Sequence, residues 1–594
     1  MSTIFLLTLI AAATCAPTDE FVESFVKGIE EMEKIAETYQ YKQENFVPEH
    51  YNTSETSEYD FIIVGSGPSG SAIANRLSET PEWKILLLEA GYIESPVSQI
   101  PAMEKYLQHT PYDWSFRTTS QKHSCLAMED SKCPLKKAKA LGGTTATDQM
   151  IYTRGNRQDY DKWADLNLKG WCWDDLLPYF MKIEDAHIPD LDRKLHNLGG
   201  HVHLERFQHS TPLGKHVLEA GHELGIKTVD YNGKDQIGVS IPQATTKDGR
   251  RNSVAQTYLG HAIKRRNLEI RTGALATKIL VSPHTKEANG VQYLQDGKLI
   301  NAKATKEVIV SAGAVNTPKL LMLSGIGPKD ELEALKIEPV CDLKVGHHLK
   351  DQLTFYGLNF IANSTAKHPT VRESVEELLH HHNGPLTTPG AEAVAYLKTS
   401  ASKEKLDLPD VELLVTRGDR VKKETHEHDR FSIEVTLLHP KSTGKLSLHD
   451  ADPLHHPLID TNSLTDPDEE DLHSMVAGIK AALKLAETHS LQKLGVRLDH
   501  DKLPACKHIE DDEYWRCAVR HSAVNRGNVA GTARMGGEHQ DKEAVVDGRL
   551  KVMGVHRLRV ADASVVPVTI SGNLVGPSIV VGERAAHLIK EDWK

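Results

Sequence analysis

The sequence lacks three features that would each indicate a different class of protein. Beyond a short leader it has no run of about 18 apolar residues, the length that a membrane-spanning helix needs. It has no excess of basic residues, since 70 Lys and Arg stand against 82 Asp and Glu for a net charge of −12, and this argues against a nucleic-acid-binding surface. It also has no internal repeat or low-complexity tract. With 594 residues, 39% hydrophobic and 26% charged, we expect a globular protein of two or three domains.

The N-terminus predicts a secreted protein. Ile4 to Ala13 is a short apolar run followed by small residues, the pattern of a signal peptide, although no Lys or Arg precedes it. We therefore expect residues 1–16 to be removed and the mature protein to be extracellular without a membrane anchor. Two glycosylation sequons, at Asn52 and Asn363, fit a secretory route.

Cysteine is scarce, with seven residues in the chain, of which Cys15 would leave with the leader. Six would then remain in an oxidising compartment. Two pairs are close enough in sequence to close small loops, and the other two residues are candidate buried thiols, although the sequence does not fix the connectivity. The pairs are Cys125 with Cys133 and Cys506 with Cys517, and the candidate thiols are Cys172 and Cys341.

Residues 60–72 and 84–91 predict a strand, a glycine-rich turn, a helix and a second strand that ends in an acid. In a dinucleotide-binding unit, Gly65 makes the tight turn, Gly67 lets the backbone approach a pyrophosphate, and Gly70 lets the helix pack on the strand. The pyrophosphate lies at the N-terminal end of that helix, beside Ser69. Glu89 is placed to accept hydrogen bonds from ribose hydroxyls and would repel the extra phosphate of NADP. The pattern therefore favours NAD or FAD.

Further segments resemble the signatures of the glucose-methanol-choline (GMC) flavoprotein family. In chain order they are residues 141–145 (LGGTT), 152–163, 311–327, 546–547, 558–564 and 572–573. The resemblance runs from about residue 58 to the end of the chain, in the family's order. It implies bound FAD, a two-domain fold and an ancestral reaction that oxidises alcohols.

The resemblance also implies which residues contact the flavin. Asp148 stands where relatives usually have Asn beside the flavin. Thr147 stands where some relatives carry the His that links the flavin covalently, so noncovalent FAD is implied. The pairing of Cys125 with Cys133 fits animal members of the family. The other implied flavin-site residues are Gly142, Gly143, Thr144, Asp562 and Asn573.

The motifs predict a mixed α/β (α+β) protein with a discontinuous, Rossmann-like FAD-binding domain. The strand-like runs 307–311 and 557–561 each end at a flavin-type motif, so the chain must return twice to one sheet. Alternating residues in 432–438 and 444–448 indicate an antiparallel sheet that faces the flavin. We predict a helical lead-in at 17–57, an FAD-binding domain of residues 58–160, 300–345 and 526–594, and a substrate-binding domain of residues 161–299 and 346–525.

The chain departs from the family pattern at the expected catalytic base. Relatives have a His three residues before a Gly-Thr pair, and this His takes the hydroxyl proton as hydride leaves for the flavin. Here the residue is Asn528, and the second active-site position is Asn573. An amide forms hydrogen bonds but does not titrate near neutral pH, so base catalysis worth about 10² to 10⁴ in rate is lost unless another group supplies it. An ionised Asp148 would also oppose negative charge on a reduced flavin, whereas a protonated one would not.

Three functions remain open on this basis: weakened or diverted oxidation of a small organic alcohol, redox-neutral lyase or isomerase chemistry, and a noncatalytic FAD-binding role. His521, seven residues before Asn528, is a candidate displaced base. The most obvious clusters among the 32 histidines lack the spacing of a metal site on a helix face, so we predict surface histidines and no metal. The partner is a small-molecule substrate, and the oligomeric state is open, a homodimer included.

Overall fold

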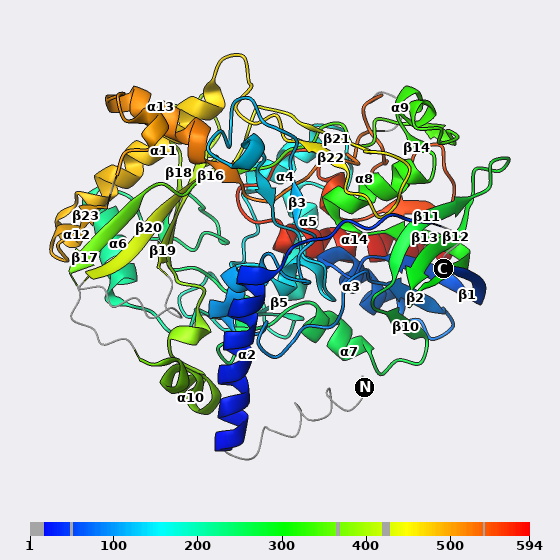
Figure 1. Cartoon of the computed structure of the whole chain (residues 1–594), viewed down its shortest axis with the longest axis horizontal. Coiled ribbons are helices and arrows are strands. Elements are labelled where there is room, and N and C mark those ends of the chain that lie inside the picture. The colour runs from blue at the N-terminus through cyan, green and yellow to red at the C-terminus, as the bar shows by residue number, and fades with distance from the viewer. Residues whose placement is uncertain (1–16, 48–50, 364–368, 419–427, 500, 538–540) are drawn as a thin grey trace.

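The computed structural model describes all residues except 1–16, 48–50, 364–368, 419–427, 500 and 538–540. It has two large sheets, one near each end of the molecule, with helices packed around them (Figure 1). The predicted signal peptide lies outside the described residues, as does Ser364 of the second sequon. None of the described helices is both long enough and apolar enough to cross a membrane.

The first sheet contains seven strands in the order β10-β2-β1-β13-β12-β11, with β25 also paired to β13. β10, β2, β1, β13 and β25 pair in parallel, whereas β13, β12 and β11 form an antiparallel meander. The end of β13 and β25 coincide with the predicted runs 307–311 and 557–561, so the chain returns twice to this sheet as predicted. The strands are β1 (Asn52–Val64), β2 (Ile85–Leu88), β10 (Leu268–Arg271), β11 (Leu275–Val281), β12 (Ala288–Gln295), β13 (Lys298–Val310) and β25 (Leu558–Val560).

One predicted domain boundary differs from the structure. Strands β10 to β12 belong to the first sheet, although they lie in the 161–299 segment that we assigned to the substrate-binding domain. Leu268 of β10 pairs with Ile85 of β2, and Val291 of β12 pairs with Ala302 of β13. Val291 is fully buried in the core of this sheet. The segment carries no nucleotide motif, so its sequence alone gives no reason to place it here.

Three helices bring distant parts of the chain to the first sheet: α3 (Pro68–Leu77), α8 (Gly313–Leu323) and α14 (Val575–Trp593). The last four residues of β1 and all of β2 are apolar and buried, as expected for parallel strands covered by helices on both faces. α14 packs closely on α3, since a Cβ on Gly582 would meet the Ser69 carbonyl oxygen at 2.5 Å. The last helix of the chain is therefore part of the nucleotide-binding unit.

The second sheet is antiparallel and contains eight strands, in the order β23-β17-β20-β19-β18-β7, with β16 and β24 attached through β20. The predicted strand 432–438 is part of β20. The predicted strand 444–448 is β21 (Lys445–Ser447), but it pairs with β22 (Leu458–Asp460) in a separate sheet. The strands of the large sheet are β7 (Gly238–Ser240), β16 (Leu353–Phe355), β17 (Asn359–Asn363), β18 (Ala391–Leu397), β19 (Val411–Arg417), β20 (His428–Leu437), β23 (Arg497–Leu498) and β24 (Val524–Asn525).

Helices pack on the second sheet and along the lead-in. α11 (Glu470–Ala486) lies on β19 and β20 and contacts both α6 (Pro212–Glu223) and α13 (Asp511–Ser522). α2 (Asp19–Thr38) forms the expected helical lead-in and packs against α10 (Val371–His381). Its apolar side is buried through Val22, Phe25, Ile29 and Met32.

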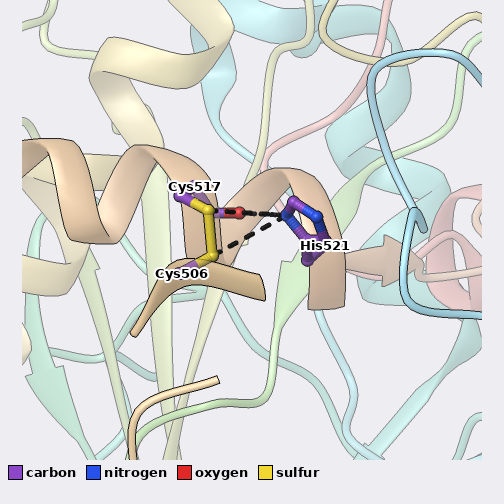
Figure 2. A group of neighbouring side chains, drawn as sticks. All are labelled: Cys506, Cys517 and His521. Carbon is purple, nitrogen blue, oxygen red and sulfur yellow. Dashed lines mark hydrogen bonds between the residues drawn. A yellow bond between two sulfur atoms is a disulfide. The ribbon is translucent and has the colours of Figure 1, made fainter. Parts of the chain in front are cut away.

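The structure contains both disulfides that the spacing allowed, Cys125–Cys133 and Cys506–Cys517. Cys172 and Cys341 are free and only half-buried. Figure 2 shows the second disulfide, which ties the turn before α13 to that helix, with His521 one helical turn beyond Cys517. Each disulfide closes a short loop, so the restraint is local.

Candidate functional site

A cavity lies at the carboxyl ends of the parallel strands, lined by the last residues of β1 and β2, Val64 and Leu88, and by Ser311, the residue after β13. This is the place where ligands bind in open α/β sheets. We call it the nucleotide cavity. Eight of the predicted site residues line it: Gly65, Gly67, Ser69, Glu89, Gly143, Thr144, Asn528 and Asp562.

The three glycines of the turn have different roles in the structure. A Cβ on Gly65, whose φ is +98°, would meet the Ser311 carbonyl oxygen at 2.3 Å, and a Cβ on Gly70 would meet the Gly65 oxygen at 1.9 Å. Packing of the protein against itself therefore requires both. A Cβ on Gly67 would meet nothing closer than the Gly143 Cα at 4.0 Å. Gly67 keeps free space at the N-terminus of α3, where first-turn N–H groups lack partners within the helix, and this fits a pyrophosphate.

Glu89 follows β2 and holds its carboxylate at the cavity wall. Oε2 accepts hydrogen bonds from the Ser66 N–H (3.0 Å) and hydroxyl (2.7 Å), and Oε1 accepts one from the Gly91 N–H (2.8 Å). Burial raises the pKa of this carboxyl, and these three donors act against that rise. A carboxylate can accept about four hydrogen bonds, so Oε1 has capacity left for a ribose hydroxyl.

Asp562 also lines the nucleotide cavity, but the protein already satisfies its carboxylate. Oδ1 accepts from the Ser564 N–H (2.8 Å) and hydroxyl (2.5 Å), and Oδ2 accepts from the Gly313 N–H (2.9 Å) and the Thr317 hydroxyl (2.6 Å). Asp562 therefore ties the start of α8 to the turn after β25. By linking these two segments, Asp562 holds this part of the cavity wall in place.

A second cavity adjoins the first on the side of the antiparallel sheet, and we call it the adjoining cavity. It contains Asp148, Asn573, and Glu434 from β20, which lies in the antiparallel sheet expected to face the flavin. Six residues line both cavities: Lys137, Ala138, Thr144, Gly527, Asn528 and Val575. This shared border is the place where a substrate would meet the reactive part of a bound dinucleotide.

Asn573, in the adjoining cavity, reaches Asn528 at this border. The Asn528 amide donates to Gln352 Oε1 at 2.8 Å and, more weakly, to Asn573 Oδ1 at 3.5 Å. Gly572, with φ +140°, sets the turn before Asn573, and Asn573 Nδ2 donates to the Ile151 carbonyl oxygen at 3.2 Å. Both amides can hold a hydroxyl, but neither can remove its proton.

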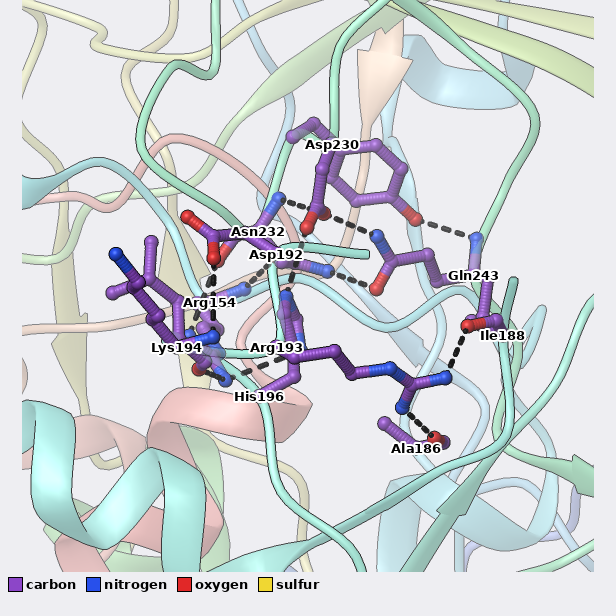
Figure 3. Close-up of polar contacts among 12 residues, drawn as sticks. Arg154, Ala186, Ile188, Asp192, Arg193, Lys194, His196, Asp230, Asn232 and Gln243 are labelled. Carbon is purple, nitrogen blue, oxygen red and sulfur yellow. Dashed lines mark hydrogen bonds and ion pairs between the residues drawn. The ribbon is translucent and has the colours of Figure 1, made fainter. Parts of the chain in front are cut away.

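A buried ionic network holds the segment that contacts Asn573. Arg154 binds both carboxylate oxygens of Glu184 at 2.6 and 2.7 Å, and His196 bridges Glu184 (2.8 Å) and Asp230 (3.0 Å). Figure 3 shows Arg154, His196 and Asp230 close together among loops. Burial alone lowers the pKa of His196, but its two carboxylate partners outweigh this and raise it. The network fixes residues 151–154, to which Asn573 is bonded.

The remaining predicted residues lie nearby in other roles. Gly70 packs against Gly65, and the Gly142 N–H donates to the Ser66 hydroxyl at 3.2 Å. Asp148 lines the adjoining cavity but not the nucleotide cavity, and it forms an ion pair with the buried Arg251 at 2.8 Å. Burial raises the pKa of Asp148, and Arg251 opposes the rise. An ionised Asp148 is therefore compensated by a cation, which the sequence argument did not foresee.

His521 lies away from the shared border. Its Nδ1 is 2.9 Å from the Cys517 carbonyl oxygen, beside the Cys506–Cys517 disulfide (Figure 2), and it lines neither cavity. Several charged residues that were not predicted from the sequence also line the adjoining cavity, among them Lys137, Glu434 and Arg526. Lys137 and Arg526 lie four residues before Leu141-Gly142-Gly143 and two before Asn528, so proximity to the motifs could have identified them.

Possible metal ligands gather elsewhere among the described residues. Asp185, His187 and His203 form one such group on β5 (Glu184–Ala186), β6 (Val202–Leu204) and the residue after β5, and His449, Asp450 and His455 form another. None of these residues lines either cavity. These two groups therefore place no metal ligand at the border between the cavities.

Comparisons with known proteins agree with this geometry. GMC oxidoreductase family models match residues 59–354 and 440–582. A glucose dehydrogenase [FAD, quinone] of Drosophila melanogaster is 37% identical over 90% of this chain and 87% of its own length. An ecdysone oxidase of Spodoptera littoralis is 33% identical over 93% and 94%. Among solved structures, the formate oxidase of Aspergillus oryzae has a TM-score of 0.80 at 25% identity, covering 91% of this chain and 99% of that one.

The matched regions contain the glycine turn, Glu89, the shared border and Asp562, and the free space at Gly67 fits FAD, which the name of the glucose dehydrogenase and the description of the formate oxidase structure both mention. The chain belongs to the GMC oxidoreductase family and is an FAD-dependent flavoprotein.

Proposed function

We propose that this protein oxidises a small organic alcohol to a carbonyl compound, more slowly than relatives that carry a catalytic His. The observation that supports this most directly is the shared border, where the nucleotide cavity opens onto a second cavity at Asn528. The relatives named above, a glucose dehydrogenase and an ecdysone oxidase, also fit oxidation of a hydroxylated compound.

FAD, when bound, supplies the two-electron acceptor for this reaction. The residues of the chain bind the cofactor and orient the substrate. Gly67 and the first turn of α3 would hold the pyrophosphate, and Glu89 would hold the ribose. Asn528 and Asn573 would hold the substrate hydroxyl at the border. Thr147 offers no imidazole for a covalent link, so we propose that FAD is held without a covalent bond.

The adjoining cavity indicates a polar substrate. Its charged lining includes Glu434, whose pKa burial raises to about 7, and Arg526, which donates to Glu412 at 2.7 Å and to the Thr436 hydroxyl at 2.7 Å. Glu434 itself accepts from the Thr416 hydroxyl at 3.0 Å. We therefore propose an alcohol with additional hydrogen-bonding groups.

A redox-neutral reaction is the second candidate, and the amide pair itself favours it. Asn528 and Asn573 hold polar groups without titrating, which suits addition to, or elimination from, a carbonyl compound better than proton removal from an unactivated alcohol. In this case FAD would remain oxidised throughout turnover.

One experiment distinguishes the candidates. The purified protein is denatured with acid to test whether yellow cofactor is released, and the native protein is then mixed anaerobically with primary, benzylic, allylic and polyhydroxylated alcohols. Loss of the oxidised flavin absorbance with formation of the carbonyl product is the expected result. A flavin that no alcohol reduces would overturn alcohol oxidation. Product formed from a hydroxynitrile, or from another substrate of a redox-neutral reaction, with the flavin still oxidised would favour the second candidate.

We also propose that the mature protein is secreted and begins near residue 17. Intact mass of protein recovered from the medium of expressing cells, before and after deglycosylation, tests this directly. Retention of residues 1–16 in secreted material would contradict it.

A further inference from the structure

The shared border contains one titratable side chain. Of the six described residues that line both cavities, Ala138, Gly527 and Val575 have no polar side-chain group, and Thr144 and Asn528 do not ionise near neutral pH. The sixth is Lys137. Its position is therefore the one from which an ionisable group of this border can reach both a cofactor and a substrate.

Lys137 is held next to Asn528 by a hydrogen bond. Its Nζ donates to the carbonyl oxygen of Gly527, the residue immediately before Asn528. The Gly527 N–H in turn donates to Asp351 Oδ2 at 3.2 Å. The backbone leading into Asn528 thus lies between a lysine and a carboxylate, and the amine is placed beside the position where relatives carry their base.

The groups around Lys137 allow it to exist as an amine. It is enclosed by protein, and the surface left open borders the two cavities. This burial lowers its pKa, while Asp351 and Asp562 act to raise it. Asp351 is buried as well, which raises its own pKa to about 7, and its Oδ1 has no hydrogen-bond partner among the described residues. The four bonds to Asp562 already bind that carboxylate to other donors.

We infer that Lys137 is the proton acceptor of the proposed alcohol oxidation, taking over the task that Asn528 cannot perform. The inference rests on the proposed function. The substrate O–H bond breaks and its proton forms a new N–H bond on the Lys137 amine, which becomes an ammonium. The C–H bond of the carbon that bears this hydroxyl also breaks, and its hydrogen leaves with the electron pair to the bound flavin. The alcohol is oxidised to a carbonyl compound, and the flavin gains the two electrons.

Other ionisable groups are less well placed. His521 lines neither cavity. Glu434 and Asp148 line the adjoining cavity but not the border, and Arg251 holds Asp148 in an ion pair. His439 lines neither cavity, and its two ring nitrogens form hydrogen bonds with the hydroxyls of Ser571 at 2.8 Å and Thr569 at 3.2 Å.

The test compares variants of Lys137 with a matched control by anaerobic stopped-flow reduction of the FAD-loaded protein. Lys137→Met removes the amine and should slow reduction about 10² to 10⁴-fold. Lys137→Arg keeps a positive charge but cannot accept a proton near neutral pH, so it should be slowed as much. Adding Asn528→His to Lys137→Met should restore reduction. Lys132→Met, at an exposed position outside both cavities, is the matched control and should reduce like the wild type.

A second measurement does not depend on turnover. Reductive methylation with ¹³C-formaldehyde labels the lysine amines, and the resonance absent from the Lys137→Arg protein is assigned to Lys137. Its ¹³C shift, followed against pH in the FAD-free protein, should titrate below the exposed lysines.

The outcomes separate this inference from the proposed function. A wild type that no alcohol reduces would overturn both. Reduction of the wild type that is unchanged in Lys137→Met would overturn the inference alone. Reduction retained in Lys137→Arg but lost in Lys137→Met would also overturn it, because only the charge would then be needed. A Lys137 resonance that titrates with the exposed lysines would contradict the amine form.

Discussion

Replacing Asn528 with His should accelerate flavin reduction by an alcohol that already fits the pocket. In the wild type, the Asn528 Nδ2 donates to Gln352 Oε1 at 2.8 Å. The Nδ1 of an imidazole occupies nearly the same position on the side chain, so its N–H can keep this bond. That bond fixes the tautomer and leaves Nε2 unprotonated, at the border of the two cavities. The substitution thus adds a base that Gln352 orients.

The size of the effect follows from what a base contributes. General-base catalysis is worth about 10² to 10⁴ in rate, or about 3 to 5 kcal/mol of barrier. If Lys137 already accepts the proton, the gain in the wild type should be smaller than the gain in Lys137→Met. The ring is larger than the amide, but Asn528 borders open space on both sides, so the added atoms can extend into the cavity.

Anaerobic stopped-flow reduction with primary, benzylic and allylic alcohols measures the rate directly. Asn528→Gln is the control, because it lengthens the side chain and keeps an amide, and it should give no gain. A wild type that is reduced rapidly, and no faster after Asn528→His, would refute the reasoning that Asn528 limits the reaction.

Three further predictions concern the framework of the site. Gly67→Val should abolish FAD binding but leave the fold intact, because a Cβ there meets no protein atom closer than 4.0 Å; absorbance and the melting temperature of the FAD-free protein check this, and a variant that still binds FAD would contradict it. Asp148→Asn should destabilise the protein by about 3 to 5 kcal/mol, since it removes the ion-pair partner of the buried Arg251; an unchanged denaturant midpoint would count against the ion pair. His196→Gln should cost more stability near pH 6 than near pH 8, because the raised pKa of His196 makes its contribution complete below its unfolded value of about 6.5 and lost as pH rises through the folded value. Equal losses in melting temperature at the two pH values would argue against that charge.

Much of this fold was predictable, because its motifs constrain the backbone locally. A glycine turn, an apolar strand and a terminal acid can be recognised from the sequence alone, and the structure requires Gly65 and Gly70 because a Cβ on either would clash with a backbone oxygen. β10 to β12 were assigned to the wrong domain because nothing in their sequence specifies a partner strand, and only the register against β2 and β13 does so.

The site was harder to predict because its chemistry depends on pairs of residues distant in sequence. The Asp148–Arg251 pair spans 103 residues, and Lys137 reaches its partner across 390. A family pattern describes Asp148 as an isolated carboxylate and gives Lys137 no role. The neighbours that neutralise the first and hold the second become visible only in the folded chain.

The contact between α3 and α14 also determines when this protein can acquire its cofactor. Ser69 donates to the Ser578 carbonyl oxygen at 2.6 Å, across 509 residues of chain, and β25 joins the sheet only after Val560 has been synthesised. During synthesis the early βαβ segment (β1, α3 and β2) is therefore made before β13, β25 and α14. Its open strand edge can then pair with a wrong strand. FAD uptake should follow synthesis of α14, and a nonsense mutation that removes α14 should leave a protein without flavin.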